Sequence, residues 1–349
     1  IWSPEGHHLD LYTKIRSIIK PFWPIFLLTS VCWSQFSKDI DTTYRISFVD
    51  KIIVKANIST EKDTYSFRSS DDIFKLTTND DLRMFLSLDY EFIGASIGFA
   101  PKFLAPNRDN SEKGRSSFTD YRFRFFLGNW VQGIQFKKTQ GYHVDTRDLS
   151  IDGEENLDPY ILFPNLKNRV WAMSTAYVFN PKFSLRNLIY QTEWQKKSAG
   201  SFIPSVFYDL SRFSNTEDGI ASTEDMFNVR FSMGYYHTFV IHQKWFLSPS
   251  LSPSLGTRFS KFRTIENGED VVEHDTYFLK FLEGGFQIGY SSKRIIFGGN
   301  FNFNINWHNE DDTKIKNDQL YGVLYFGYRF DAPEFVQKSF NWINQKAGF

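Results

Sequence analysis

Apolar and polar residues alternate almost without error along one stretch of the sequence, residues 297–307. One face carries Phe297, Phe301, Phe303, Ile305 and Trp307, and the other carries Asn300, Asn302, Asn304 and Asn306. Successive side chains of a strand point to opposite faces, so the stretch predicts a strand with large apolar groups on one side and uncharged amides on the other. Soluble sandwiches seldom combine such faces, whereas a transmembrane barrel has lipid outside and a hydrated interior.

The same alternation recurs along much of the chain, for example in residues 229–239, 245–259 and 320–330. After Pro333 the spacing of Phe335, Val336, Phe340 and Ile343 changes to that of a helix. We therefore predict an all-β fold, a transmembrane antiparallel up-and-down β-barrel, with a short C-terminal helix. The expected number of strands is about twelve, within a range of about ten to fourteen.

Composition agrees with a barrel and excludes several other classes. Aromatic residues make up 18% of the 349 residues, yet the mean hydropathy is −0.38. A barrel reconciles these values because half of each strand can be polar. The net charge of +0 leaves no electrostatic footprint for nucleic acid, so the expected partners are the outer-membrane lipid bilayer and other envelope proteins. A single cysteine, Cys32, and histidines without ligand spacing predict no metal site and no cofactor.

The N-terminal region has the order of a secretory signal peptide. Basic residues within 14–20 precede an apolar run over 21–35, and small residues near its end predict cleavage at Ser34 or Gln35. The alternative is a membrane anchor or a buried helix. We expect upstream residues and the signal peptide in 1–35, an N-terminal segment with the first strand or strands in 36–81, the barrel in 82–330, and a periplasmic amphipathic segment in 331–349. This organisation predicts the outer membrane of a Gram-negative bacterium as the location.

The connections between strands should alternate in length, because such barrels have short periplasmic turns and long external loops. The predicted long loops are 100–116, 141–166, 213–226, 260–275 and 308–316. The predicted tight turns are Glu91, Gly128-Asn129, Asn180-Pro181, Gln243-Lys244 and Ser291-Ser292. We also predict a strand from Leu185 to Trp194 and a glycine bulge at Gly284-Gly285, where the alternation changes phase. Pro249 and Pro253 within a strand predict either a short neighbouring strand or a bend.

Several segments resemble a known family, the outer-membrane β-barrel proteins of Bacteroidetes known as domain of unknown function 4421. They are Asp50-Lys51, Tyr177-Val-Phe-Asn-Pro-Lys182, Gln195-Lys-Lys-Ser-Ala-Gly-Ser-Phe202, Leu247-Ser-Pro-Ser-Leu-Ser-Pro253 and Tyr328-Arg-Phe-Asp-Ala-Pro333. The resemblance covers nearly all of the chain after the signal peptide, and it implies an outer-membrane barrel with no established activity.

The most specific of these segments is a candidate site, which we call the motif loop. It comprises Gln195, Lys196, Lys197, Ser198, Gly200 and Ser201. The serines beside lysines suggest a Ser-Lys nucleophile or a cationic patch for a lipid phosphate. A Ser-Lys pair needs a desolvated lysine, whereas a loop at headgroup level is wet. We therefore favour a connection between two strands, with no catalytic residue, and we do not place a serine beside His237.

The polar faces of the strands predict residues that line the lumen. They are Arg122, Arg124, Arg230, Asn300, Asn302, Asn304, Asn306 and Arg329. These side chains either line a selective passage for small solutes or anions, or fill the interior with a hydrogen-bonded network. We favour the filled interior and a non-catalytic envelope component with a structural or partner-binding role. The alternatives are a narrow solute or anion channel and, second, a lipid-directed hydrolase or acyltransferase.

Overall fold

The computed structural model describes residues 42–48, 50–68, 73–108, 111–148, 158–217, 219–266, 268–310, 313–316 and 319–347. The predicted signal peptide lies outside these residues. The chain divides into two units, and the larger one, Ile40–Ala332, contains all the described strands.

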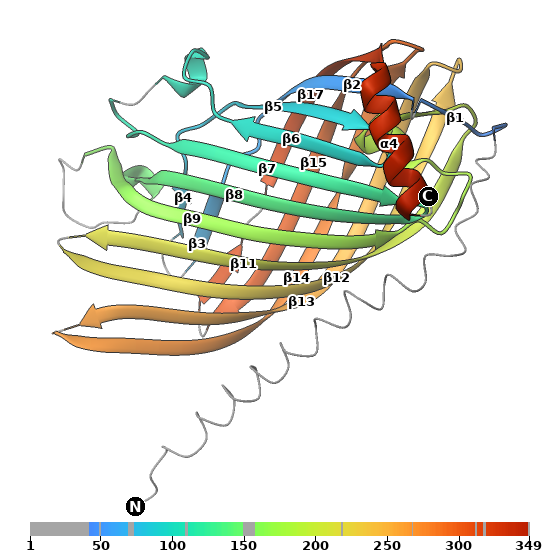
Figure 1. The fold of residues 1–349 in the computed structure, drawn as a ribbon. Helices are drawn as coiled ribbons and strands as arrows, with labels where there is room; N and C mark the ends of the chain where they lie inside the picture. The colour runs from blue at the N-terminus through green and yellow to red at the C-terminus, as the bar shows by residue number, and fades with distance from the viewer. Residues whose placement is uncertain are drawn as a thin grey trace, which may run out of the picture. The chain divides into compact units, whose positions relative to one another are not determined.

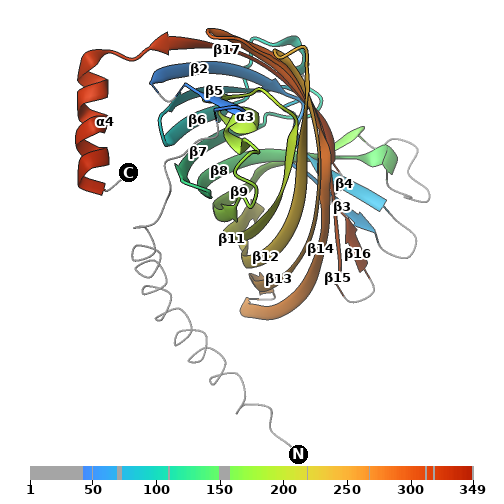
Figure 2. The ribbon, with the colours of Figure 1, turned by 90° about the vertical axis from the view of Figure 1, so that its right-hand side faces the viewer.

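Twelve antiparallel strands form a closed barrel (Figures 1 and 2). The strands are β2 (Lys51–Ser59), β5 (Arg83–Tyr90), β6 (Ile93–Phe99), β7 (Ser117–Leu127), β8 (Trp130–Asp145), β9 (Tyr160–Tyr177), β11 (Ala199–Glu217), β12 (Ile220–Ile241), β13 (Trp245–Glu266), β14 (Glu269–Ser291), β15 (Ile295–Glu310) and β17 (Gln319–Asp331). The last strand pairs with the first, with Phe326 opposite Ala56. The ring therefore has no free edge, and the predicted barrel is confirmed.

The two faces of the barrel wall differ as the alternation predicts. Apolar side chains point outward, and Leu324 and Leu255 are 70% and 57% exposed. The next residues along the strands point inward, where Ser254 and Arg329 are buried. A closed ring with such an outer surface is stable in lipid, so the chain is an outer-membrane barrel of a Gram-negative bacterium. Within the described residues, no helix has the length and apolarity needed to cross a membrane.

The predicted strand from Leu185 to Trp194 is wrong. Residues Leu185–Ile189 form the short helix α3, whose first turn is capped by the Ser184 hydroxyl, which accepts a hydrogen bond from the Asn187 amide at 2.9 Å. The following strand β10 (Glu193–Gln195) pairs only with β1 (Arg45–Ser47), outside the barrel ring. The segment Asp50 to Ser59, which the sequence left uncertain, supplies the twelfth strand as β2.

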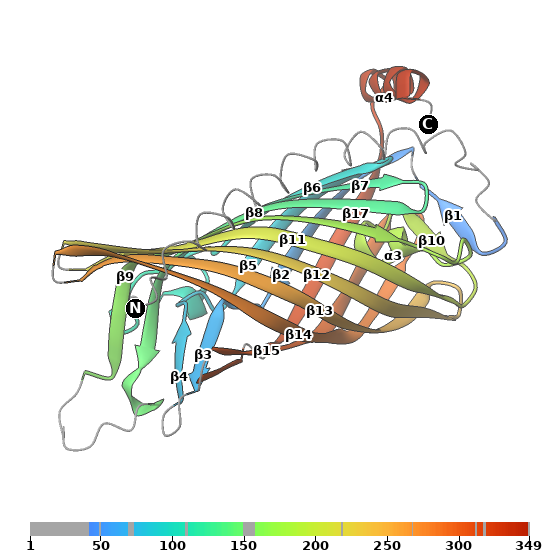
Figure 3. The same ribbon diagram turned by 90° about the horizontal axis from the view of Figure 1, so that it is seen from below.

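Three of the predicted long loops, 213–226, 260–275 and 308–316, are also wrong. In the last of them, residues 307–310 pair with residues 313–316. Strands β11 and β12 remain paired as far as Glu217 opposite Ile220, and β13 and β14 as far as Glu266 opposite Glu269. These four strands are 19 to 23 residues long (Figure 3). A tilted strand needs only about 9–11 residues to cross the bilayer, so their polar ends continue as paired strands beyond it.

The connections between successive strands lie alternately at the two ends of the barrel. Tight turns at Glu91, Gly128 and His242, all with positive φ, join successive strands at one end, which we call the short-turn end. The segment 178–198 lies at the same end, so the predicted tight turn at Asn180-Pro181 is instead a long connection. At the opposite, long-loop end, the short strands β16 (Thr313–Lys316), β3 (Thr64–Arg68) and β4 (Ile73–Thr77) pair in this order between β15 and β8, within the same sheet. The one-turn helices η2 (Ala105–Asn107) and η3 (Thr146–Asp148) also lie at this end.

The predicted bulge at Gly284-Gly285 is wrong. The pairing of β14 with β13 and with β15 continues through both glycines without a shift in register. The phase changes because Leu279, which is buried, and Phe281 point into the barrel, whereas Phe278 is exposed outside. The interior is therefore partly apolar toward the long-loop end, and alternation alone assigned these residues to the wrong face.

Of the two explanations predicted for the prolines of β13, the short neighbouring strand is wrong. The neighbouring strand β12 is long, and the register is the same on both sides of the interruptions. Pro249 and Pro253 remain in register with β14, and the ladder is interrupted only toward β12. Inward-facing hydroxyls bridge this interface instead, with 2.6 Å between the oxygens of Ser232 and Ser252.

The C-terminal helix is present as α4 (Glu334–Ala347), which confirms the helix predicted after Pro333. Its amides at Val336 and Gln337 donate to the Pro333 carbonyl, so the proline begins the first turn. Phe335 and Trp342 are 72% and 63% exposed.

Substitution Leu324→Arg on the outer face of β17 should lower the free energy of unfolding by about 2–4 kcal/mol, because a charge would face the middle of the bilayer. Ile265→Arg is the matched control, since this residue also faces outward but near the tip of β13. Urea unfolding in phospholipid vesicles, followed by tryptophan fluorescence, measures both. Equal losses for the two variants would contradict a bilayer around the outer face of β17.

Candidate functional site

The barrel interior contains two adjoining cavities. The larger, with a volume of about 750 Å³, reaches toward the long-loop end, where Asn215 lines it. The smaller, about 480 Å³, lies nearer the short-turn end and is lined by Leu185 and Tyr190. Arg122 and Arg124 of β7 line both cavities and so mark the place where they meet.

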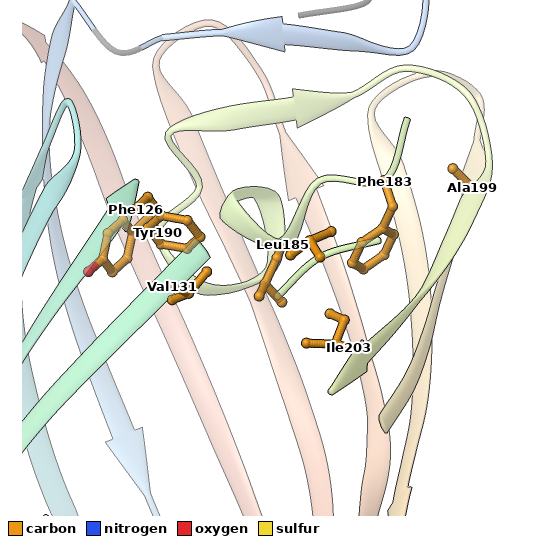
Figure 4. Close-up of a cluster of buried hydrophobic side chains, with 8 residues drawn as sticks. Phe126, Val131, Phe183, Leu185, Tyr190, Ala199 and Ile203 are labelled. Carbon is orange, nitrogen blue, oxygen red and sulfur yellow. The ribbon is translucent and has the colours of Figure 1, made fainter. Parts of the chain in front are cut away.

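The connection from β9 to β11, residues 178–198, folds into the short-turn end of the barrel, and we call it the plug (Figure 2). Phe183, which is 1% exposed, and Leu185 join a hydrophobic cluster with Val131 and Ile203 of the wall (Figure 4). The ring of Tyr190 meets that of Phe126 edge-on, with 4.7 Å between the ring centres. The plug is thus part of the core and forms the floor of the smaller cavity.

Charged side chains tie the plug to the wall. The Arg186 guanidinium donates to the carbonyl oxygens of Glu91, at 2.9 Å, in the turn after β5, and of Phe126, at 3.1 Å, near the end of β7. From β2, the Lys55 ammonium donates to the Ile189 carbonyl at 2.7 Å. These bonds satisfy backbone carbonyls that would otherwise be buried without a donor.

A second set of contacts surrounds Gln191. Its side-chain oxygen accepts from Lys55 at 2.8 Å, and Lys55 also pairs with Asp89 at 3.0 Å. The Nε of Arg329 donates to the Gln191 carbonyl at 3.0 Å, and its Nη1 donates to the Ser292 carbonyl. Arg329 points inward as the sequence predicts, but it lies against the plug and not along an open lumen.

Two other predicted lumen arginines form ion pairs. Arg122 lies 2.7 Å from Asp120, and Arg230 lies 2.8 Å from Glu283. The Arg230 guanidinium also stacks between aromatic rings. Asn300 and Asn302 line the smaller cavity, and Asn304 and Asn306 line the larger one. The structure thus places all of these side chains on the cavity walls, spread over both cavities instead of in one cluster.

The motif loop joins the plug to β11. The buried Gln195 amide donates to the carbonyls of Lys182, at 2.8 Å, and Lys197, at 3.0 Å, and its side-chain oxygen accepts from the Ser184 amide. Lys196 and Lys197 are exposed. A Cβ on Gly200 would lie 2.5 Å from both the His237 ring and the Tyr235 hydroxyl, so the glycine permits close packing against β12.

The hydroxyls of the motif loop are used in structural hydrogen bonds. Ser198 accepts from the Val240 amide, and Ser201 accepts from the Asn180 amide, each at 3.0 Å. His237 faces Tyr235, with 3.2 Å between the ring nitrogen and the hydroxyl. Among the described residues, no three His, Cys, Asp or Glu side chains are grouped as metal ligands. This arrangement does not bring a serine, a histidine and an acid together.

Sequence reasoning missed a charged cluster at the long-loop end, formed by Asp63, Arg83, Lys137 and Thr139. Asp63 lies in the connection between β2 and β3, is 5% exposed, and accepts from Lys137 at 2.8 Å and Thr139 at 2.6 Å. Burial alone would raise the pKa of this carboxyl, but the charges of Lys137 and Arg83 outweigh it and hold the pKa well below its usual range. The signal in the sequence was the charged run Glu61-Lys62-Asp63, which did not indicate the partners of Asp63.

Comparison with known proteins identifies a family. The family model described as Domain of unknown function (DUF4421) matches residues 39–330. No curated protein matches the chain. Among solved structures, the outer membrane protease OmpT from Escherichia coli is similar at 8% identity and a TM-score of 0.39, over 82% of this chain and 98% of that one. LpxR from Salmonella typhimurium is similar at 10% identity and a TM-score of 0.36, over 80% and 100%. Likeness at these levels concerns the fold alone.

Substitution Asp63→Asn should destabilise the barrel at neutral pH by about 3–5 kcal/mol, because it leaves buried positive charge unpaired. Since the folded-state pKa lies below the unfolded value of about 3.9, the carboxylate stabilises the fold fully above that pH and loses this effect on acidification. The difference between wild type and variant in urea unfolding should therefore shrink as the pH falls below about 4. Asp270→Asn, an exposed control, should change little, and a pH-independent difference for Asp63→Asn would contradict the prediction.

Proposed function

We propose that this chain, which belongs to the DUF4421 family, is a non-catalytic component of the outer membrane whose lumen is a vestibule closed at the short-turn end. The single observation that carries the proposal is the plug, whose Leu185 and Tyr190 form the floor of the smaller cavity. Short turns lie on the periplasmic side of such barrels, so the vestibule faces the outside of the cell. The role is structural or binding, and it does not require an open pore.

The way in which the plug is held supports a permanent closure. Phe183 is almost completely buried, and Arg186, Lys55 and Arg329 form hydrogen bonds that join plug and wall. Release of the plug would leave these cations without their acceptors inside the barrel, which is costly. The closed form is therefore the stable state of the isolated protein.

A non-catalytic role is supported by the motif loop. Ser198 and Ser201 accept backbone hydrogen bonds, and Lys196 and Lys197 are exposed to solvent, where an ammonium keeps its proton and is a poor base. The Ser-Lys alternative therefore has no geometric support in this loop.

A narrow channel is the second candidate, and one observation favours it. The two cavities meet at Arg122 and Arg124, so only the plug separates the vestibule from the periplasmic side. Passage of a solute would require the plug to move. The two candidates thus differ in whether the isolated barrel conducts ions.

Single-channel recording in planar bilayers distinguishes them. We expect the refolded wild type to be silent, and a variant in which a Gly/Ser linker of equal length replaces residues 185–192 to open in steps, because the floor of the vestibule is removed. The same replacement at residues 103–106, in a largely exposed loop at the other end, should stay silent. Heat-modifiable gel mobility confirms that each barrel has folded. Frequent openings of the wild type, equal to those of the linker variant, would refute the closed vestibule.

A further inference from the structure

Arg124 differs from the other cations of the barrel interior. Lys55, Lys137, Arg122 and Arg230 each have a carboxylate partner within 3.0 Å. For Arg124, no hydrogen bond or ion pair is found within the part of the chain that the structure describes, although its side chain is largely shielded from bulk solvent and lines both cavities. An arginine that stays charged inside a barrel without a counter-charge is unfavourable unless something else compensates it.

The surroundings of Arg124 leave room for such a group. Its neighbours across the ladder are Gly94 on β6 and Gly133 on β8. The side chains of Asp89 and Tyr190 lie over Gly94, and the Ser174 hydroxyl lies over Gly133, so the open space next to Arg124 is that of the two cavities. The two wall carboxylates whose charges act on Arg124 already have partners, Asp89 with Lys55 at 3.0 Å and Asp120 with Arg122 at 2.7 Å. The guanidinium therefore faces the junction of the cavities with its donors available.

We infer that the vestibule binds a small solute through an oxyanion group, a carboxylate or a phosphate, with Arg124 as the principal contact. This inference rests on the proposed closed vestibule and adds the class of its ligand. The planar fork of an arginine matches the geometry of a carboxylate or phosphate and holds either through two parallel hydrogen bonds. The cavities, at about 480 and 750 Å³, are within the size range of small-molecule sites.

The walls next to Arg124 indicate the rest of the solute. Phe262 and Leu279 line the larger cavity, so an apolar portion can pack there. Asn302 and Asn304 offer uncharged amides on the facing strand β15. A bound solute would thus have its oxyanion at the junction of the two cavities and its remaining part toward the long-loop end. The solute would enter from that end.

Calorimetric titration of the full chain in detergent micelles tests this, with acetate, succinate and inorganic phosphate as separate probes in a chloride buffer. We expect at least one probe to bind the wild type, and the affinity to fall at least tenfold in Arg124→Gln. Arg124→Lys should restore only part of the affinity, because it keeps the charge without the fork. Whether succinate or phosphate binds more tightly identifies the oxyanion. Arg212→Gln is the matched control, since it removes the same charge from an exposed site at 2.5 Å from Asp225.

Urea unfolding gives a second readout that does not depend on ligand affinity. Without added oxyanion, Arg124→Gln should be at least as stable as the wild type, because it removes an uncompensated charge, and saturating probe should raise the unfolding midpoint of the wild type only. Equal affinity of wild type and Arg124→Gln, or no binding of any probe to the wild type, would overturn the inference. A silent barrel without oxyanion binding refutes the ligand and leaves the vestibule in place, whereas a conducting wild type refutes the vestibule itself.

Discussion

The need to satisfy every backbone hydrogen bond inside lipid determines the rest of this structure. An amide or carbonyl without a partner in the hydrocarbon layer costs several kcal/mol, so a sheet that crosses it must close on itself. The pairing of β17 with β2 achieves this closure, and the outward residues of every strand are then free to be apolar. Where the prolines of β13 interrupt the ladder to β12, the Ser232 hydroxyl donates to the Pro253 carbonyl at 3.3 Å and so satisfies a backbone group.

Closure of the sheet also encloses polar side chains, which water can reach only from the two ends of the barrel. Most of the enclosed charged side chains form ion pairs, as Lys55 does with Asp89 and Arg230 with Glu283. At the short-turn end the chain itself supplies the partners: carbonyls of the plug accept from the wall cations Lys55 and Arg329, and Arg186 of the plug donates to wall carbonyls. The barrel interior is thus filled in part by paired side chains, and it is also the place where a solute would bind.

The sequence predicted the features that depend on the alternation of apolar and polar residues. The predictions were wrong where contacts between distant parts of the chain determine the structure. Inward and outward faces could be read because a strand has a period of two, yet Leu279 and Phe281 were assigned to lipid although they face inward. Residues 185–194 were predicted as a strand because nothing local shows that Ser184 caps a helix inside a barrel. The lumenal arginines were found from parity, but only the fold distinguishes Arg329, held by the plug, from Arg124, which lacks a partner among the described residues.

The plug is covalently continuous with two strands that are neighbours in the wall, since β9 and β11 pair with each other with Ala176 opposite Ser205. A segment tethered at both ends cannot diffuse away, so its local concentration at its own seat stays very high. Any opening is therefore a first-order event whose reversal does not depend on the amount of protein present. A plug that left its seat would return to it, and a single cut in the plug by a protease would leave both halves still anchored to the wall.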